Sequence, residues 1–127
     1  DKSEAVRGST SITSMKQNFA QGYQYQEQPI MISEFGGIAF VESNSEDEDD
    51  WGYGDRVNDE EEFLNRFEEI TKTIIATDYM SGFCYTQLTD VQQEVNGLLD
   101  EDHNYKFDPQ KIRKVLETKY NGGFIFE

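Results

Sequence analysis

The chain has 127 residues, enough for one domain, and its 26 acidic against 11 basic side chains give a formal net charge of −15. Such an acidic chain lacks the basic surface that binding to nucleic acid or to an anionic membrane requires, and no apolar run has the length of a membrane helix. Its aromatic fraction of 13% suffices for a hydrophobic core. Cys84 is the only cysteine, which excludes an intrachain disulfide and favours a reducing compartment such as the cytoplasm.

The first 28 residues form a polar leading segment that is rich in Ser and Thr in its first half. Ser14 and Gln17 have the spacing of a capping box, and Gly22 is a natural helix stop. A short helix over residues 14–22 is therefore predicted.

Residues 29–34 form the first predicted strand, because Pro29 can begin a strand and an apolar run follows it. The run ends on Glu34, and a carboxylate at the end of a buried strand must be hydrogen-bonded, paired or functional. Gly36 and Gly37 then allow a sharp turn and close approach of another group. This is how a parallel-barrel enzyme presents a catalytic group, although an acid that caps a helix or pairs with an arginine gives the same pattern.

A long loop is expected between Ile38 and Asn58. Residues 46–50 are five consecutive acids, which predicts a solvated, mobile segment without a bound metal. Calcium is the alternative, but the alternating ligands of an EF-hand loop are absent. The next four residues, Trp51-Gly52-Tyr53-Gly54, suit either stacking on the apolar face of a sugar ring or anchoring of the loop to the fold.

Residues 58–77 form the clearest predicted helix. Asn58 is expected to be the N-cap and Glu61 to complete a capping box, with acidic side chains at the positive end of the helix dipole. Apolar residues at helical spacing predict a stripe that faces the core. Its members are Phe63, Leu64, Phe67, Ile70, Ile74 and Ile75.

The second predicted strand covers residues 82–88, with Cys84 as a small buried hydrophobe in its middle. Strand, helix and strand in this order predict a parallel βαβ unit. Asp108 and Pro109 then begin a last helix as N-cap and N1. The residues expected on its inner face are Ile112, Val115, Leu116 and Tyr120. The tail, residues 121–127, has no place in this pattern.

Three blocks resemble, in order and spacing, the last part of the catalytic barrel of glycoside hydrolase family two: Ile-Ser-Glu-Phe-Gly-Gly, Gly-Phe-Cys-Tyr-Thr-Gln-Leu-Thr-Asp and Gln-Glu-Val-Asn-Gly-Leu. That family contains β-galactosidases, β-glucuronidases and β-mannosidases. The resemblance implies that residues 29–120 are the last two β/α units of a (β/α)8 TIM barrel. A complete barrel needs about 250 residues, so an α/β fragment without the first six strands is expected. The start at Asp1, without a methionine, fits a fragment or a processed product.

The resemblance implies a retaining hydrolase of β-galactosidase type, which needs no cofactor. Retaining glycosidases use two carboxylates about 5–5.5 Å apart, one as nucleophile and the other as acid and base. Glu34 matches the family's nucleophile. The family's acid/base is a Glu that follows an Asn, and this chain contains no Asn-Glu pair. The isolated chain is therefore expected to be inactive.

Four residues are expected to bind substrate: Tyr85, Gln87, Trp51 and Asp90. Tyr85 stands where members of the family often have a Trp in the sugar-binding floor, and strand alternation favours an inward orientation of Tyr85 and Gln87, with packing as the alternative. Asp90, Glu94 and Asn96 match the family's Asp-Val-x-x-Glu-x-Asn-Gly pattern. Hydrogen bonds that organise the loop are their alternative use.

Two functions of different classes follow from the sequence. The chain is the C-terminal part of a retaining glycosidase, or it is a non-catalytic acidic module that binds a carbohydrate or a protein. Its expected partners are a carbohydrate substrate and the upstream part of the barrel, and the exposed edges of two strands predict self-association of the chain alone. The sugar and the linkage stay open.

Overall fold

The computed structural model describes residues 18–41, 52 and 56–118. Contacts divide the chain into two units, residues 1–30 and 31–127. In the first unit, residues 18–22 lie in bends and turns, with the Tyr23 amide donating to the Ala20 carbonyl at 3.0 Å. The predicted helix is wrong for these residues, because all of them except Phe19 are exposed, and a short helix without a packed face is marginal in water. Residues 14–17 lie outside the described residues.

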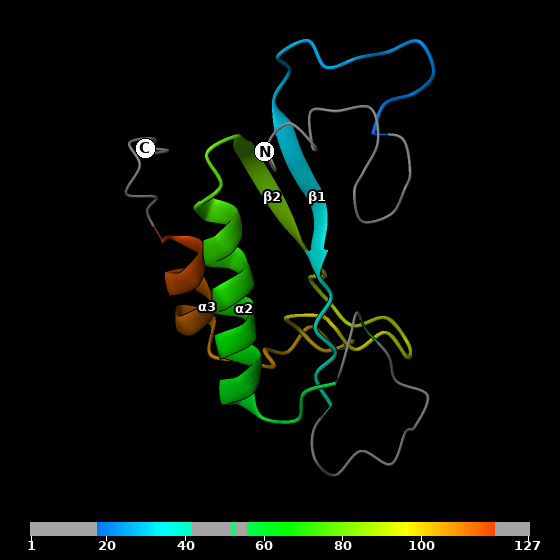
Figure 1. Ribbon diagram of the computed structural model, residues 1–127. Coiled ribbons are helices and arrows are strands. Elements are labelled where there is room, and N and C mark those ends of the chain that lie inside the picture. The colour runs from blue at the N-terminus through cyan, green and yellow to red at the C-terminus, as the bar shows by residue number, and fades with distance from the viewer. Residues whose placement is uncertain (1–17, 42–51, 53–55, 119–127) are drawn as a thin grey trace. The chain divides into compact units, whose positions relative to one another are not determined.

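The second unit is built on a parallel βαβ arrangement, which confirms the predicted α/β class (Figure 1). Strand β1 (Ile30–Gly36) pairs with strand β2 (Met80–Thr86), and helix α2 (Glu60–Ile75) lies between them in sequence. Helix α3 (Pro109–Leu116) follows and packs against α2. Within the described part of the chain, no helix is long and apolar enough to cross a membrane.

Both strands are shifted from their predicted limits. β1 runs two residues beyond Glu34, so this carboxylate does not end the strand. β2 begins at Met80, directly after a turn in which the Met80 amide donates to the Thr77 carbonyl. It ends at Thr86 because the backbone of Gln87 pairs with the loop that follows, donating to Asn96 and accepting from Leu98.

Helix α2 begins later than predicted, and Asp59 rather than Asn58 is its N-cap. The Asp59 side chain accepts a hydrogen bond from the Glu62 amide at 2.9 Å. Val57 explains the shift, because its backbone pairs in parallel with the segment after β1, donating to Ala39 and forming a bridge with Phe40. This extended pairing leaves Asn58 outside the helix, and Asp59 is the next side chain that can cap it.

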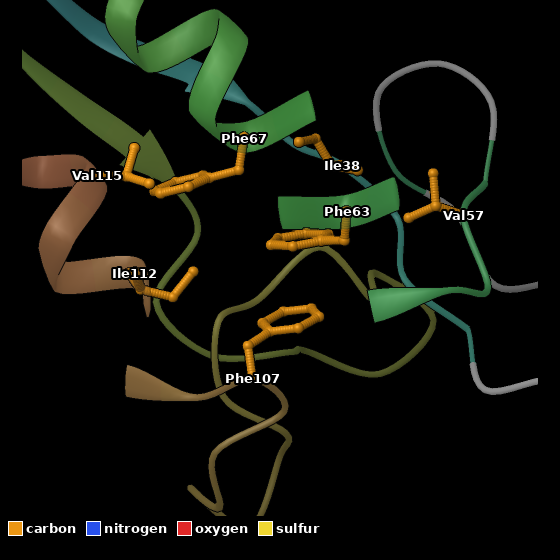
Figure 2. Close-up of a cluster of buried hydrophobic side chains, with 7 residues drawn as sticks. All are labelled: Ile38, Val57, Phe63, Phe67, Phe107, Ile112 and Val115. Carbon is orange, nitrogen blue, oxygen red and sulfur yellow. The ribbon is translucent and has the colours of Figure 1, made fainter. Parts of the chain in front are cut away.

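The core is a cluster of side chains from both helices and from the segments that follow the strands (Figure 2). The Phe63 ring stacks on the Phe107 ring, with 3.8 Å between centroids and 10° between planes. Phe67 and Ile74 are buried on the same face of α2, which confirms the predicted stripe. The buried members of the cluster are Ile38, Val57, Phe63, Phe67, Phe107, Ile112 and Val115.

Helix α3 has the predicted start but ends at Leu116. Asp108 accepts from the Gln110 amide and Pro109 occupies the first turn. Ile112 and Val115 are buried as predicted, whereas Leu116 is 41% exposed. That part of the prediction is wrong: Leu116 is the last residue of α3 and lies at the edge of its buried face, about 40° around the helix from Ile112 and about 100° from Val115. Tyr120 and the tail lie outside the described residues.

The N-cap assignment can be tested by a matched pair of substitutions. Asp59→Ala should lower the free energy of unfolding by about 1 kcal/mol, because the Glu62 amide loses its acceptor. Asn58→Ala should leave it nearly unchanged. Chemical denaturation of both variants measures the difference, and an equal loss in the two would contradict the assignment.

The two strands should also make the isolated chain self-associate. β1 and β2 contain no proline or lysine and a single charge, Glu34, so the sheet edges carry few of the features that prevent pairing with another chain. Met31 is 60% exposed on β1. Light scattering should show that Met31→Lys reduces association, while Leu116→Lys on α3 does not. A monomeric wild type at high concentration would refute this expectation.

Candidate functional site

The two faces of the β1–β2 sheet have different surroundings. The Phe35 ring contacts the rings of Phe83 and Tyr85, each at 5.6 Å between centroids, and Tyr85 meets Phe67 of α2 at 5.1 Å. These side chains therefore lie on the face that α2 covers. Because neighbouring side chains alternate along a strand, Glu34 lies on the opposite face, where it is exposed.

Cys84 shares the uncovered face, since its neighbours Phe83 and Tyr85 turn toward α2. It is exposed, with its Sγ 3.9 Å from the Tyr85 carbonyl oxygen. The prediction of a buried Cys84 is therefore wrong. Strand alternation, rather than residue type, decides its environment.

The predicted inward orientation of Tyr85, away from the helix, is also wrong. Its ring packs between Phe35 and Phe67, and its Oη donates to the Asn96 carbonyl at 3.2 Å. Burial raises the pKa of the Tyr85 phenol far above its ordinary value, so the hydroxyl stays a hydrogen-bond donor. A Cβ on Gly36 would come within 2.3 Å of this ring, so the tyrosine requires a glycine at the end of β1.

The carboxyl ends of β1 and β2 meet at one edge of the sheet. The amide of Gly37, the residue after β1, donates to the carbonyl of Thr86, the last residue of β2, at 2.8 Å. Beyond this point Phe40 donates to Val95 at 3.0 Å, which joins the segment after β1 to the loop after β2. The loop begins with Gln87, whose half-buried side chain donates to the Glu94 carbonyl at 3.4 Å. The structure thus brings the strand of Glu34 next to the loop that begins with Gln87, residues 87–108.

The long loop after β1 returns to the same edge. A Cβ on Gly52 would lie 2.7 Å from the Gly37 carbonyl oxygen and from the Ala39 side chain, so only a glycine fits there without displacement. Trp51 and the acidic run 46–50 lie outside the described residues, and the expectations for sugar stacking and for calcium stay predictions. Among the residues that the structure describes, no group of three or more His, Cys, Asp and Glu side chains could hold a metal ion.

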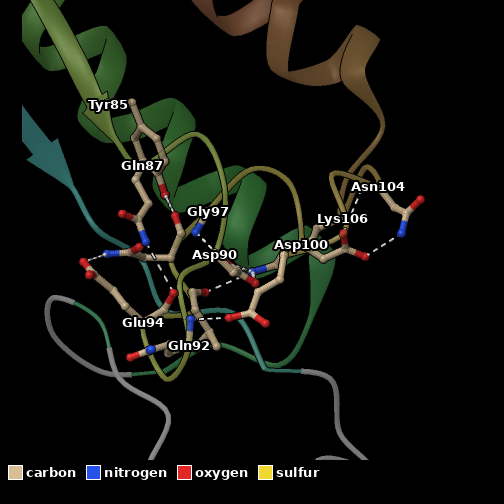
Figure 3. Close-up of polar contacts among 12 residues, drawn as sticks. Tyr85, Gln87, Asp90, Gln92, Glu94, Gly97, Asp100, Asn104 and Lys106 are labelled. Atoms are coloured by element: carbon tan, nitrogen blue, oxygen red, sulfur yellow. Dashed lines mark hydrogen bonds and ion pairs between the residues drawn. The ribbon is translucent and has the colours of Figure 1, made fainter.

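Asp90 organises the loop between β2 and α3 (Figure 3). Lys106 Nζ lies 2.7 and 2.9 Å from its two carboxylate oxygens, and the Gly97 amide donates to Oδ1 at 2.7 Å. Both side chains of the ion pair are only about a tenth exposed, 10% for Asp90 and 11% for Lys106. These are the loop-organising contacts expected as the alternative to substrate binding. A substrate contact of Asp90 stays a prediction.

The ion pair is largely buried, and burial and the neighbouring Lys106 change the pKa of Asp90 in opposite directions. Burial raises the pKa of the Asp90 carboxyl above its usual value, while the hydrogen bond and the positive charge of Lys106 act to lower that pKa. The Gly97 amide also lowers it, and the nearby Asp100 raises it. Burial is the largest of these effects, so the ionised carboxylate depends on Lys106.

Asn96 is fully buried in the same loop, between the strand end and the ion pair. Its Nδ2 donates to Glu94 Oε1 at 3.1 Å, and its backbone carbonyl accepts from Tyr85 Oη and from the Gln87 amide. Its Oδ1 has no hydrogen-bond partner among the described residues. Asp90, Glu94 and Asn96, which the sequence groups as one pattern, therefore belong to one hydrogen-bonded loop.

Lys106 is the residue of this region that the sequence patterns above did not predict. A signal was present, because Lys106 is the only lysine or arginine between β2 and α3, in a segment with six acidic residues. Its neighbours Tyr105 and Phe107 are aromatic, and Phe107 is buried in the core. A lone cation beside a core residue indicates a buried charge that needs a partner.

Removal of Lys106 should reveal the cost of burying Asp90. Lys106→Met should lower the free energy of unfolding by about 3 kcal/mol near neutral pH, because the carboxylate loses its cation and its pKa rises further. The deficit relative to wild type should be present above the raised pKa of Asp90 and should shrink as the pH falls through that pKa, because Asp90 then binds a proton. Urea unfolding at several pH values measures this.

Lys111→Met is the matched control, because Lys111 forms an exposed ion pair with Glu60 at 3.2 Å. Its effect should be small and nearly independent of pH. A Lys106→Met deficit that stayed constant down to pH 4 would show that Asp90 is not the group left unpaired.

Neither a scan against protein-family models nor a search of curated proteins found a match to this chain. The resemblance carried by the three sequence blocks therefore stays a prediction. At the carboxyl ends of the two strands, the strand of Glu34, the loop that begins with Gln87, and Gly52 lie together.

Proposed function

We propose that this chain is the C-terminal part of the catalytic barrel of a retaining glycosidase that acts on β-galactoside-like substrates, with Glu34 as the nucleophile. The observation that supports this most is the position of Glu34 on the face of a parallel sheet that α2 does not cover. In a (β/α)8 barrel the helices lie outside, so this face of each strand lines the interior. The position agrees with the match of Glu34 to the family's nucleophile.

The surroundings of the strand ends support the same proposal. Active sites of such barrels are built from the loops at the carboxyl ends of the strands. Here the segments after β1 and β2 are joined to each other through the Phe40–Val95 hydrogen bond, and Gln87 is the first residue after β2. Gly52, the residue after Trp51, approaches the exit of β1. Gln87 and Trp51 are the proposed sugar contacts.

The proposed chemistry requires two carboxyl groups. The Glu34 carboxylate attacks the anomeric carbon and forms a glycosyl ester, while the acid/base gives its proton to the departing oxygen. The acid/base then takes a proton from water, which cleaves the ester and releases Glu34 as a carboxylate. Since this chain has no residue that matches the acid/base, the proposal requires a longer parent protein that supplies it with the first six strands.

The test is a substitution in that parent protein. Glu34→Gln should lower turnover by several powers of ten, because the amide cannot attack the anomeric carbon, and each factor of ten corresponds to about 1.4 kcal/mol of barrier. A mechanism-based 2-fluoroglycoside should label Glu34 of the wild type, which mass spectrometry of the digested protein can locate. Glu61→Gln, an exposed residue of the first turn of α2, is the matched control and should keep normal turnover.

Two other results would contradict the proposal. Labelling of another residue, or near-normal turnover of Glu34→Gln, would exclude Glu34 as the nucleophile. If the native protein ended with these 127 residues and still bound sugars or a protein without hydrolysis, it would be the non-catalytic binding module that the sequence leaves as the alternative. Intact mass of the native protein decides its length.

A further inference from the structure

Lys106 contacts a second residue besides its ion-pair partner Asp90, in the loop at the carboxyl ends of the strands. Its Nζ donates to both oxygens of Asp90 and to the Val95 carbonyl, at 3.0 Å. All three hydrogens of the ammonium group thus have acceptors within the loop. In a chain with a net charge of −15, this cation is held inside the fold rather than on the acidic surface.

The Val95 carbonyl extends the contact to β1. It accepts one hydrogen bond from Lys106 Nζ and another from the Phe40 amide, both at 3.0 Å. The ammonium group also lies 5.8 Å from the centroid of the Phe40 ring, within the range of a cation–π interaction. Lys106 therefore joins the loop after β2 to the segment that leaves the strand of Glu34.

Asp90 extends the contact in the other direction, toward Gln87. Its Oδ1 accepts from the Gly97 amide, and the residues on either side of Gly97 pair with the backbone of Gln87. The Asn96 carbonyl accepts from the backbone amide of Gln87 at 3.3 Å, and the Leu98 amide donates to the Gln87 carbonyl at 3.2 Å. The conformation of Gln87 thus depends on the segment that Asp90 and Lys106 hold in place.

We propose that Lys106 is a positioning residue that acts through Asp90 and Val95 to fix Gln87 relative to Glu34. This inference rests on the proposed function, in which Gln87 binds the sugar and Glu34 attacks it. Loops at strand ends are normally the mobile part of a fold, and a displacement of about 1 Å in a sugar contact weakens binding strongly. The loop has no helix or strand to order it, and a buried cation with three directed hydrogen bonds stabilises one loop conformation.

The first test is kinetic and uses the parent glycosidase with the nitrophenyl β-glycoside that the wild type hydrolyses best. Lys106→Met should raise KM about tenfold or more and lower kcat by less than about threefold, because the ground-state contact of Gln87 is lost while Glu34 stays in place. A variant that is only partly folded would instead show a lower apparent kcat with an unchanged KM. Lys111→Met, with its exposed ion pair, should change neither constant.

The second test needs no activity and uses this chain itself. Amide hydrogen exchange should be about tenfold faster or more at Gly97 and at Phe40 in Lys106→Met than in Lys111→Met, because the two acceptors lose the cation that orders them. If Lys106→Met does not fold, Lys106→Gln keeps a donor for the Val95 carbonyl and serves in both tests.

The outcomes separate the two proposals. An unchanged KM in an active Lys106→Met enzyme, or unchanged exchange at Gly97 and Phe40, overturns the positioning role and leaves Glu34 as nucleophile untouched. A parent protein that hydrolyses no glycoside and is not labelled at Glu34 overturns the proposed function, and the sugar-positioning role with it. Faster exchange together with a raised KM supports the inference.

Discussion

The stacked rings of Phe63 and Phe107 hold the two helices and the loop after β2 together. A sheet of two strands is only marginally stable in water, so β1 and β2 need a packed layer beside them. Phe63 comes from the first turn of α2, and Phe107 directly precedes the N-cap of α3. Their contact places both helices and closes the loop after β2 onto the core.

The same aromatic packing gives the sheet its two unlike faces. Tyr85 and Phe35 extend the core from α2 onto the strands. Because side chains alternate along a strand, Glu34 and Cys84 lie on the uncovered face. A nearly uncharged pair of strands with one uncovered face suits a sheet that is continued by further strands. The proposed barrel would supply those strands, and the carboxylate on that face is then its most informative residue.

The two strands carry a single charge, whereas the loop between β2 and α3 holds a buried ion pair. Most acidic side chains in the described part of the chain are exposed, but Asp90 is largely buried, and its charge is compensated by Lys106 and by the Gly97 amide. Such a pair adds little net stability, because both charges lose their hydration. Its effect is one of geometry, since it permits a single arrangement of the residues between Gln87 and Leu98.

The features that depend on local spacing could be predicted from the sequence. The α/β order, the apolar stripe of α2 and the start of α3 at Asp108 and Pro109 follow from periodicity and capping, and the structure confirms them. The resemblance singled out Glu34, whose catalytic role stays a prediction.

Other features depend on partners that are distant in the sequence, and they appear only in the folded chain. Val57 pairs with the segment after β1 and so moves the helix cap to Asp59, while Phe67 draws Tyr85 to the helix side of the sheet. Asp90 finds Lys106 sixteen residues away, a pairing that local patterns do not encode because it forms only when the loop closes on the core.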